Sequence, residues 1–502
     1  MSMVINTNTA AMVAQAAQAK TNKAMDTAME RLSTGQRINA AADDAAGLAI
    51  ATRMEANVRG MNQAIRNASD AQSLIDTMEG AQDETMNLMQ RIRELAVQSA
   101  NDTNSAADRQ SLHDEVIQLR TEIDRIAATT TWAGQKLLDG TFAGKTFQIG
   151  AVGGETISVN QNAMNSASIG EFSAETTAFV IAASTDSSTD NAATKFTVTG
   201  KDGSADASFG AGATAKSAAA AVNADTVSTG VSAKAHTAIR ISFASAGNDP
   251  ITQTSFSLNG GGTAVSISAT VTDKDDLSAL LTAINSNSGT TLVTAEFDSG
   301  DKSKLILRQA SGDDIVINDF DADDGTTENQ LTVAVQSNYE GSSFTTGTDL
   351  VSGGSNDTRA TGVVKLSSAK EFVFTETGGG TAATAFLGAS TSAAATLDKV
   401  SAINISTRLG AQEALSVIDK ALEAIASSRG ELGAVSNRID STVANLTNIV
   451  TNTESSRSRI VDADFAAETS NLTKAQILSQ AATAMLAQAN ASKQSVLSLL
   501  QG

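Results

Sequence analysis

The chain has 502 residues and contains a single proline, Pro250. An average protein of this length would contain roughly 25 prolines. Because proline removes a backbone hydrogen bond and collides with the preceding turn, it interrupts the interior of a helix. Its near-absence therefore permits helices much longer than those of an ordinary globular domain. The chain also lacks cysteine, which excludes disulfides, thiolate metal sites and cysteine nucleophiles.

The first region, which runs to about Gly140, has the apolar spacing of long helices. From Ala46 to Ser99, apolar or small residues recur at steps of three and four, which predicts a helix with one apolar stripe. Such a helix would extend roughly 80 Å, far more than one globular core requires. A second helix is predicted from about Ser105 to Ala128. The Asn-Asp-Thr-Asn run at 101–104 is expected to separate the two helices and to supply the N-cap of the second.

The last region, from about Ser406 to Gly502, has the heptad spacing of a coiled coil. Two of the heptad positions between 415 and 450 are polar, Arg429 and Ser436, and the others are apolar. A seam of this kind requires partner helices, and the N-terminal helices carry matching stripes. We therefore expect the two ends of the chain to pack together as one antiparallel bundle. The predicted seam consists of Leu415, Ile418, Leu422, Ile425, Leu432, Ile439, Val443 and Leu446.

The extreme ends, residues 2–32 and 465–500, are Ala-rich helical patterns with weaker apolar faces. A free helix of this kind has little surface to bury by itself. We therefore expect both ends to be mobile in the monomer and to become ordered when they meet neighbouring molecules. The predicted assembly residues of the C-terminal helix are Ile477, Ala481, Met485 and Leu499.

The middle region, residues 170–400, changes to the alternating pattern of β-strands. The order strand, helix, strand occurs twice, which indicates an internal repeat at about 195–243 and 254–319. The fold class predicted for the whole chain is mainly α at both termini, with an inserted α+β or mostly-β outer region. Strands are predicted at 195–200, 238–243, 255–260, 304–309, 314–319 and 371–376, and short helices at 217–223 and 276–285.

The formal charge of the chain is −20. The middle region holds 27 acidic and 13 basic side chains, so it carries −14 of that charge. This acidity disfavours binding to nucleic acid and to anionic membranes. The stretch from Ala475 to Ser492 lacks charge but contains too many polar residues to span a bilayer. The N-terminal sequence MSMVINTNTAAM has none of the features of a cleaved signal peptide, so we expect any export to use another route.

Few residues form combinations that could carry chemistry. Asp43 and Asp44 could act as a general acid and base, but they precede a long predicted helix, whose N-terminus negative charge stabilises. His113 has no second histidine at helical spacing and reads as a solvated residue. Residues 319–325 resemble a calcium loop, but the glycine comes one place late and position twelve is Gln330, which favours an acidic turn. We predict no catalytic, metal or cofactor site and no enzymatic activity.

Several long motifs at both ends resemble the flagellin family. The match covers about 1–165 and 400–502, just over half the chain, and the motifs occur in the family's order. The central repeat resembles, over a shorter length, a motif of flagellin and hook-type proteins. The matching segments are ERLSTGQRINAAADDAAGLAIATRM (30–54), QRIRELAVQSANDTN (90–104), QKLLDGTF (135–142), FQIGAVGGETISV (147–159), AIASSRGELGAVSNRI (424–439) and ESSRSRIVDADFAAETSNLTKAQILSQAATAMLAQAN (454–490).

The resemblance implies a subunit of an extracellular bacterial flagellar filament, a helical homopolymer that serves swimming motility. In such a subunit, residues 1–45 and 460–502 would line the central channel. Residues 46–169 and 401–459 would form the surrounding tube, with a β-hairpin near 138–159. Residues 170–400 would project outward.

The resemblance also implies partners. Arg91, Leu95 and Glu115 match family positions that contact a Toll-like innate immune receptor, and the same surfaces would hold subunit to subunit. Residues 465–500 resemble the segment that a cytoplasmic export chaperone binds, and the N-terminus resembles the uncleaved signal read by the flagellar export apparatus. Filament cap and junction proteins would be further partners.

Two other functions remain open from the sequence. A hook-filament junction protein has similar terminal helices and would differ from a filament subunit in its copy number. A filament whose outer region binds a receptor or a glycan would act as an adhesin, and deletion of residues 170–400 would abolish its adhesion while sparing assembly.

Overall fold

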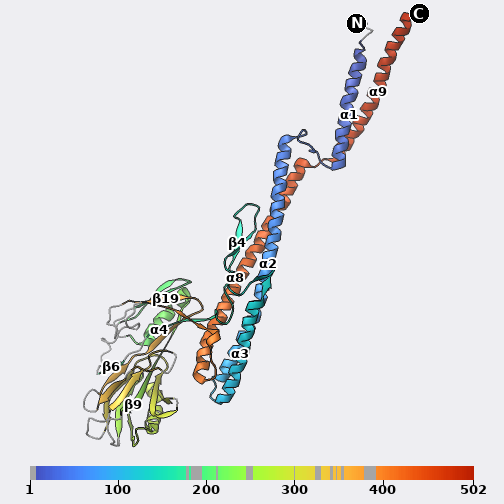
Figure 1. The fold of residues 1–502 in the computed structure, drawn as a ribbon. Helices are drawn as coiled ribbons and strands as arrows, with labels where there is room; N and C mark the ends of the chain where they lie inside the picture. The colour runs from blue at the N-terminus through green and yellow to red at the C-terminus, as the bar shows by residue number, and fades with distance from the viewer. Residues whose placement is uncertain are drawn as a thin grey trace. The chain divides into compact units, whose positions relative to one another are not determined.

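A computed structural model gives the fold of the chain (Figure 1). It describes residues 7–176, 180–182, 195–210, 213–244, 253–298, 300–322, 330–339, 343–345, 347–351, 356–377 and 392–501. The chain forms two compact units. Unit 1 comprises Met1–Thr77, Ala143–Asn160 and Glu431–Gly502, and unit 2 comprises Met78–Phe142 and Gln161–Gly430.

Unit 1 brings the two ends of the chain together. The terminal helices α1 (Thr9–Thr34) and α9 (Phe465–Gln501) lie side by side (Figure 1). The non-helical segments that precede α9 and follow α1 are also joined, because the Ala463 N–H donates to the Gly35 carbonyl at 2.9 Å and Gln36 forms an antiparallel bridge with Asp462. Gly35 ends α1 with a φ of 71°, a left-handed conformation that glycine adopts without strain.

The long helices α2 (Ala45–Ser99) and α8 (Arg408–Val461) each contribute to both units. The predicted helix at 46–99 and the predicted helical C-terminal region are therefore confirmed. Asp44 stands just before α2 and accepts a hydrogen bond from the Gly47 N–H at 2.8 Å, the stabilising role expected at a helix N-terminus. Within unit 1, Val58 and Met61 of α2 pack against Leu446 of α8.

The helix α3 (Ala106–Thr129) lies in unit 2 and corresponds to the second predicted helix. The prediction that residues 101–104 supply its N-cap is wrong. Ser105 is the N-cap: its hydroxyl accepts from the Asp108 N–H at 3.2 Å, and the Asp108 carboxylate accepts from the Ser105 N–H at 3.0 Å. Each side chain satisfies the other's backbone donor, an arrangement that the 101–104 run does not offer.

Short strands follow α3. In unit 1, β3 (Lys145–Gln148) and β4 (Thr156–Val159) form the antiparallel hairpin that the family resemblance implies, with Phe147 opposite Ile157. Its paired strands begin at Lys145, later than the expected start near Leu138. A second small ladder in unit 2 joins β1 (Thr131–Trp132) to β2 (Gln135–Lys136).

The rest of unit 2 consists of sheets with short helices on them. The largest sheet has the order β12-β13-β9-β18-β5-β21, and β15 and β16 extend it beside β9. A second sheet has the order β11-β10-β14-β17-β6 and a third the order β20-β19-β7-β8. All neighbouring strands of these sheets are antiparallel. The elements are β5 (Gly170–Glu175), β6 (Val180–Ala182), β7 (Lys195–Gly200), β8 (Ser204–Ser208), α4 (Ala215–Ala224), α5 (Thr226–Thr229), β9 (Ser232–Ala244), β10 (Thr254–Asn259), β11 (Val265–Ala269), α6 (Ser278–Ser286), α7 (Ser288–Thr291), β12 (Thr294–Asp298), β13 (Asp301–Gln309), β14 (Ile315–Ala322), β15 (Gln330–Val335), β16 (Thr348–Val351), β17 (Thr358–Ala360), β18 (Val363–Ser368), β19 (Phe372–Thr377), β20 (Ser392–Ala394), β21 (Thr396–Lys399) and the 3₁₀ turn η2 (Val400–Ala402).

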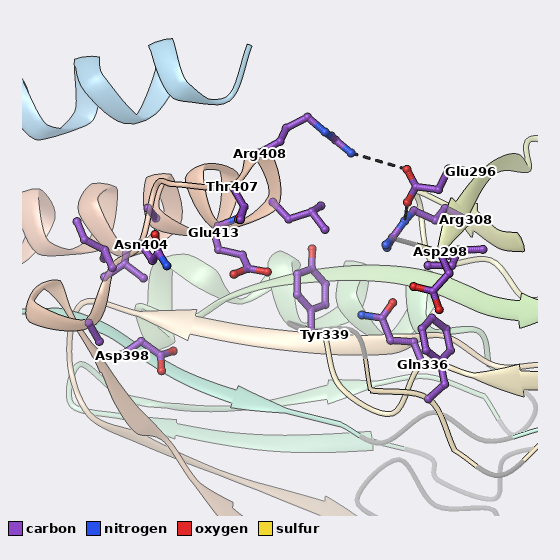
Figure 2. A pocket seen from close by; sticks show the side chains of 18 of the residues that line it. Glu296, Asp298, Arg308, Gln336, Tyr339, Asp398, Asn404, Thr407, Arg408 and Glu413 are labelled. Carbon is purple, nitrogen blue, oxygen red and sulfur yellow. Dashed lines mark hydrogen bonds and ion pairs between the residues drawn. The ribbon is translucent and has the colours of Figure 1, made fainter. Parts of the chain in front are cut away.

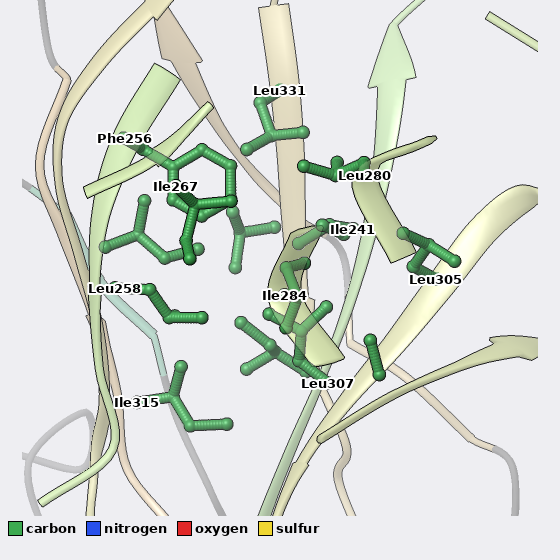
Figure 3. Close-up of a cluster of buried hydrophobic side chains, with 14 of the residues drawn as sticks. Ile241, Phe256, Leu258, Ile267, Leu280, Ile284, Leu305, Leu307, Ile315 and Leu331 are labelled. Carbon is green, nitrogen blue, oxygen red and sulfur yellow. The ribbon is translucent and has the colours of Figure 1, made fainter. Parts of the chain in front are cut away.

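Strand β9 connects two hydrophobic cores. Ala233, in its first half, belongs to a core built around Phe196 and Phe374, whereas Ile239 and Ile241, in its second half, belong to the larger core. Figure 3 shows this larger core, where side chains of β9, β10, β11, β13, β14 and β15 converge with Leu280 and Ile284 of α6. Because one strand carries residues of both cores, the two cores form one continuous body.

The predicted strands and helices of the middle region are all present, and some are longer than predicted. The predicted strand 238–243 is the second half of β9, and 304–309 is the end of β13. The fold class is confirmed: along the chain, long helices at both ends flank a middle region of sheets. The segment 319–325 begins in β14, and Asp323 lies outside the described residues.

Two parts of the middle region share one construction. In both, a hairpin is followed by a helix, a four-residue helix and a strand: β7-β8-α4-α5-β9 and β10-β11-α6-α7-β12. In the first, the Asn223 amide bonds both backbone groups of Ala233, at 2.8 and 2.7 Å. In the second, the Asn285 amide bonds both backbone groups of Ala295, at 2.9 and 2.8 Å. An asparagine thus ties the helix to the next strand at the same place in each.

The residues that end α5 and α7 differ between the two parts, and this difference predicts opposite effects of two substitutions on stability. Gly230 and Leu292 each end the four-residue helix with a left-handed φ, 71° and 62° respectively. A side chain in that conformation costs about 1–2 kcal/mol, so Leu292→Gly should leave the stability unchanged or raise it by up to about 1 kcal/mol. Gly230→Ala should lower stability by at least about 1 kcal/mol, because the new Cβ would also lie 2.9 Å from an Asp202 carboxylate oxygen.

Urea unfolding followed by circular dichroism measures both changes. Loss of stability in Leu292→Gly as large as that in Gly230→Ala would contradict the strain assigned to Leu292.

Candidate assembly surface

The pair formed by α1 and α9 is held by few interactions. Asn8 Nδ2 donates to the Ala489 carbonyl and Gln18 Nε2 to the Thr483 hydroxyl, both at 3.3 Å. Nearer the base of the pair, Arg31 forms an ion pair with Glu468 at 3.1 Å. Among the described side chains of the two helices, those of Ala28, Glu468 and Ala475 are buried. The pair therefore buries little apolar surface by itself.

The same helices expose large apolar side chains. Ile477 is 62% exposed and Met485 is 64% exposed, and Ala481, between them, is also exposed. These three predicted assembly residues are spaced by four, so they lie along one face of α9, and that face is turned away from the buried Glu468 and Ala475. The side chain of Leu499 lies outside the described part of α9. Other exposed apolar residues on this pair are Met12, Val13, Met29, Phe465 and Leu478.

The predicted seam of α8 has one buried row and one partly buried row. The buried row repeats every seventh residue and consists of Ile418, Ile425, Leu432, Ile439 and Leu446. Leu415, Leu422 and Val443, in the other row, are partly exposed. The polar residues of that row bond to α2: Arg429 pairs with Asp83 at 2.8 Å and with Glu79 at 3.3 Å in unit 2. Ser436 accepts a hydrogen bond from Gln72 in unit 1.

A buried polar cluster interrupts the apolar packing of the helices in unit 2. Gln82 of α2 donates to Gln161 Oε1 at 2.8 Å and to the Ser428 hydroxyl of α8 at 3.3 Å, and neither glutamine is exposed. Gln161 belongs to the segment that follows the hairpin, so the cluster joins three parts of the chain. Buried amides bond well in one alignment only, so the cluster favours a single register of α8 along α2.

The predicted receptor-contact residues differ in their exposure. The guanidinium of Arg91 bonds Glu115 of α3 at 2.9 Å and Glu94 at 3.0 Å. These carboxylates, Glu94 first, raise the pKa of Arg91 above its usual range. The side chains of Arg91 and Glu115 are 50% and 43% exposed, whereas Leu95 is only 1% exposed. Arg91 and Glu115 therefore lie on the surface, and Leu95 packs beneath it.

Unit 2 also contains a cavity of about 710 Å³ between the sheet and the start of α8. Figure 2 shows Tyr339 in its middle, with Arg408, Glu296 and Arg308 in a row beside it. Glu296 bonds Arg308 at 2.6 Å and lies 3.8 Å from Arg408, and Asp298, also in the lining, pairs with Arg240. The pairs of Glu296 connect β12 with β13 and with α8.

His236 lies beside this cavity. Its ring makes an edge contact with Tyr339, with 4.4 Å between the ring centres, and its Nε2 is 3.3 Å from Gln336 Oε1. Burial lowers the pKa of His236, and the nearby Arg308 adds to this effect, although the hydrogen bond to Gln336 opposes it. The imidazole is therefore neutral at pH 7, and its role is to pack β9 against Tyr339.

The described part of the chain offers neither a membrane span nor a metal site. None of the described helices is both long and apolar enough to cross a membrane. In the same residues, no group of three or more histidine and acidic side chains is arranged to hold a metal ion.

Three family models match the chain. The bacterial flagellin N-terminal helical region matches residues 5–143, and the C-terminal helical region matches residues 415–500. The flagellin hook IN motif matches residues 255–311, which covers the second of the two similarly built parts. B-type flagellin of Pseudomonas aeruginosa is 39% identical over the full length of both chains. The chain belongs to the flagellin family. It is a structural subunit of the bacterial flagellar filament.

Other relatives agree with this membership. Flagellin D of Vibrio anguillarum is 34% identical, and the match again covers all of both chains. Among solved structures, that of FliC from Burkholderia pseudomallei is similar to this flagellin with 19% identity and a TM-score of 0.29, covering 73% of this chain and 99% of that one. Flagellin is a structural protein family that forms a filament outside the cell.

Sequence reasoning did not predict the polar cluster or the ion pairs of Arg429. Gln82 and Ser428 fall among other polar residues in their helices, so no local pattern marks them as buried. The sequence did contain one sign of polar contacts, because two positions of the heptad row are polar, Arg429 and Ser436. A polar residue in a seam commonly indicates a specific partner, and both residues have one on α2.

The polar cluster generates a prediction for the stability of the bundle. Gln82→Met removes the donor to the buried Gln161 while keeping the volume of the side chain, and should lower the free energy of unfolding by about 1–3 kcal/mol. The matched control is Gln63→Met, at an exposed position of the same helix, which should change it by less than about 0.5 kcal/mol. Thermal unfolding followed by circular dichroism compares the two. Equal stability of both variants would contradict a structural role for the cluster.

Proposed function

We propose that α1 and α9 form the surface by which this flagellin polymerises. The observation that carries the proposal is the exposed apolar face of α9, at Ile477, Ala481 and Met485. Covering one such large side chain contributes about 1.5–3 kcal/mol. Neither α1 nor another described part of unit 1 covers this face. A neighbouring subunit that does so would order the terminal pair at the moment of docking.

The proposed contact extends without closing on itself. The apolar face of one subunit docks on a different surface of the next, so the interface is heterologous, and repeated heterologous contacts build an open helix. In this arrangement residues 1–45 and 460–502 line the channel of the filament, and residues 46–169 and 401–459 form the tube around it. The sheets of 170–400 then face outward, where their excess negative charge is solvated.

A junction protein at the base of the filament is the alternative. Identity of 39% to a flagellin over the whole chain favours the filament subunit. The two functions differ in abundance, because a filament subunit dominates the protein sheared from the cell surface and a junction protein is rare there. Quantitative mass spectrometry of sheared material separates them.

We also propose that the exposed faces of the terminal helices serve export before assembly. A chaperone groove that covers Ile477 and Met485 would keep the subunit from polymerising in the cytoplasm. The N-terminal segment would act as an uncleaved signal for the flagellar export apparatus. The near-absence of proline and the lack of disulfides suit passage of an unfolded chain.

Single charges on the apolar face should block polymerisation. Ile477→Asp and Met485→Asp place a carboxylate where a neighbour would exclude water, and should slow seeded growth by at least about tenfold, since an unpaired charge is costly to bury. Gln476→Asp is the control, because Gln476 is exposed on another side of α9.

Deleting residues 465–502 should leave soluble monomer. Light scattering and electron microscopy follow growth, and normal filaments from the truncated chain would refute the proposal.

We further propose that Arg91 and Glu115 contact a Toll-like innate immune receptor. Their exposure and mutual bond support a charged patch across α2 and α3, and Leu95, one turn further along α2, is buried. Arg91→Ala should weaken receptor activation by about tenfold or more, as expected for loss of a charged contact at an interface. Arg93→Ala is the control, because Arg93 is equally exposed on α2 but pairs with Asp419 of α8. A reporter-cell assay on purified monomer measures both, and equal loss of activity would exclude a specific role for Arg91.

A further inference from the structure

The chain passes twice between the helices and the sheets of unit 2, and the two passages are bonded to each other. We call them the neck, residues 166–171 and 398–403. Gly170 of β5 pairs with Lys399 of β21. Beyond this ladder the Val400 N–H donates to the Ile169 carbonyl at 3.0 Å, and the Ser401 N–H donates to the Ser166 carbonyl at 2.9 Å. The two passages are therefore bonded as a ladder at Gly170 and Lys399, and beyond it by hydrogen bonds between the turn at 166–168 and η2. We call this bonded pair the ribbon.

Two side chains of α3 hold this ribbon, one on each passage of the chain. Arg120 Nη1 lies 3.4 Å from the carbonyl oxygens of both Val400 and Ile403, and it also bonds the Ser401 carbonyl. Asp124 accepts hydrogen bonds from the Ser166 N–H at 2.7 Å and from the Ser166 hydroxyl at 2.9 Å. Arg120 and Asp124 are four residues apart, so they lie on one face of the helix. Hydrogen bonds to charged groups are among the stronger ones in proteins.

A third contact joins the neck to α8. The Ser416 hydroxyl donates to Glu171 Oε1 at 2.8 Å, and Glu171 Oε2 lies 3.1 Å from the ammonium of Lys365. The side chain of Glu171 is fully buried, and that of Lys365 is 4% exposed. A buried ion pair adds little net stability, because removing both charges from water is costly. In some proteins such a pair favours one arrangement of the groups around it, and we assign it that effect here.

The ribbon also requires one glycine. A Cβ at Gly170 would lie 2.0 Å from the Asp398 carbonyl oxygen, closer than any contact that the backbone can accept. The close approach of the two strands at this point therefore depends on the absence of a side chain.

We propose that the neck is a rigid mount, in which Arg120, Asp124 and the Glu171–Ser416 contact hold the sheets in one direction relative to the helices of unit 2. Two unsupported chain crossings would act as a hinge. Here each crossing is bonded to the other and to a helix, so the sheets cannot turn without breaking several of these bonds together.

Hydrogen exchange on the purified full-length monomer tests the mount directly. Arg120→Met removes the bonds to three carbonyls and keeps a long side chain at the position. We expect exchange of the Val400 and Ser401 amides to become at least about tenfold faster, because local opening frees these amides. The matched control is Arg125→Met on the same helix, where Arg125 is 60% exposed and pairs only locally with Glu122. Amides of β10 should be unaffected in both variants.

A second variant distinguishes local opening of the neck from a general loss of structure. Ser416→Ala removes a single hydroxyl on α8, and should speed exchange at Glu171 and its neighbours while the circular dichroism spectrum stays unchanged. Neck amides that exchange at the rate of the unmodified chain in both Arg120→Met and Ser416→Ala would overturn the proposal.

The filament gives an independent test that rests on the proposed assembly. In filaments grown from Arg120→Met, electron microscopy should show unchanged density for the helices and weaker density for the sheets. If the density of the sheets in Arg120→Met filaments is as strong as in Arg125→Met filaments, the proposal of a rigid mount is also refuted. Because the exchange experiment uses monomer, it decides on the neck even if polymerisation itself fails.

Discussion

The architecture depends on packing between helices that belong to opposite ends of the chain. One row of α8, from Ile418 to Leu446, is buried at every seventh residue, and its partners include residues of α2 such as Val58 and Met61. Neither helix could keep its apolar stripe dry alone. The pairing brings the chain ends together, and so places α1 beside α9. The terminal pair fully buries only small or polar side chains and leaves several of its larger apolar residues exposed, as the proposed assembly requires.

The same physical rule explains how much of the helical part could be predicted from the sequence. A repeat of three and four residues without proline is a strong local signal, and α2 begins one residue before the predicted start and ends at the predicted end. The N-cap of α3 was misplaced because residues 101–104 offer several side chains of the right type. Only Ser105 has an acidic residue three positions later that can return the bond. The buried Gln82 cluster gave no local signal, since its burial depends on which distant segment covers it.

In the sheets, alternation located the strands but not their partners. β9 pairs with β13, β15 and β18, which lie far along the chain from it and from each other. Its first half was missed because Lys234, His236 and Thr237 interrupt the apolar alternation. Their partners come from other parts of the assembled sheet: Lys234 stands opposite Lys365 of β18, His236 contacts Tyr339, and the Thr237 hydroxyl donates to the Asp313 carbonyl. The receptor residues illustrate a related limit, because a motif match does not distinguish the exposed Arg91 from the buried Leu95.

The ribbon formed by the neck has a consequence for the variability of the molecule. Its two strands enter and leave the sheets side by side, bonded at Ile169 and Val400. A tight turn can join two strands at that separation, so replacing the sheets as a whole leaves the backbone path from α3 to α8 connected, although it removes the contact of Glu296 with Arg408 of α8. Partial deletions are different, because β9 carries residues of both cores and any cut through it exposes the two together. Any exchange of the sheets therefore has to include all of β9, from one passage of the neck to the other.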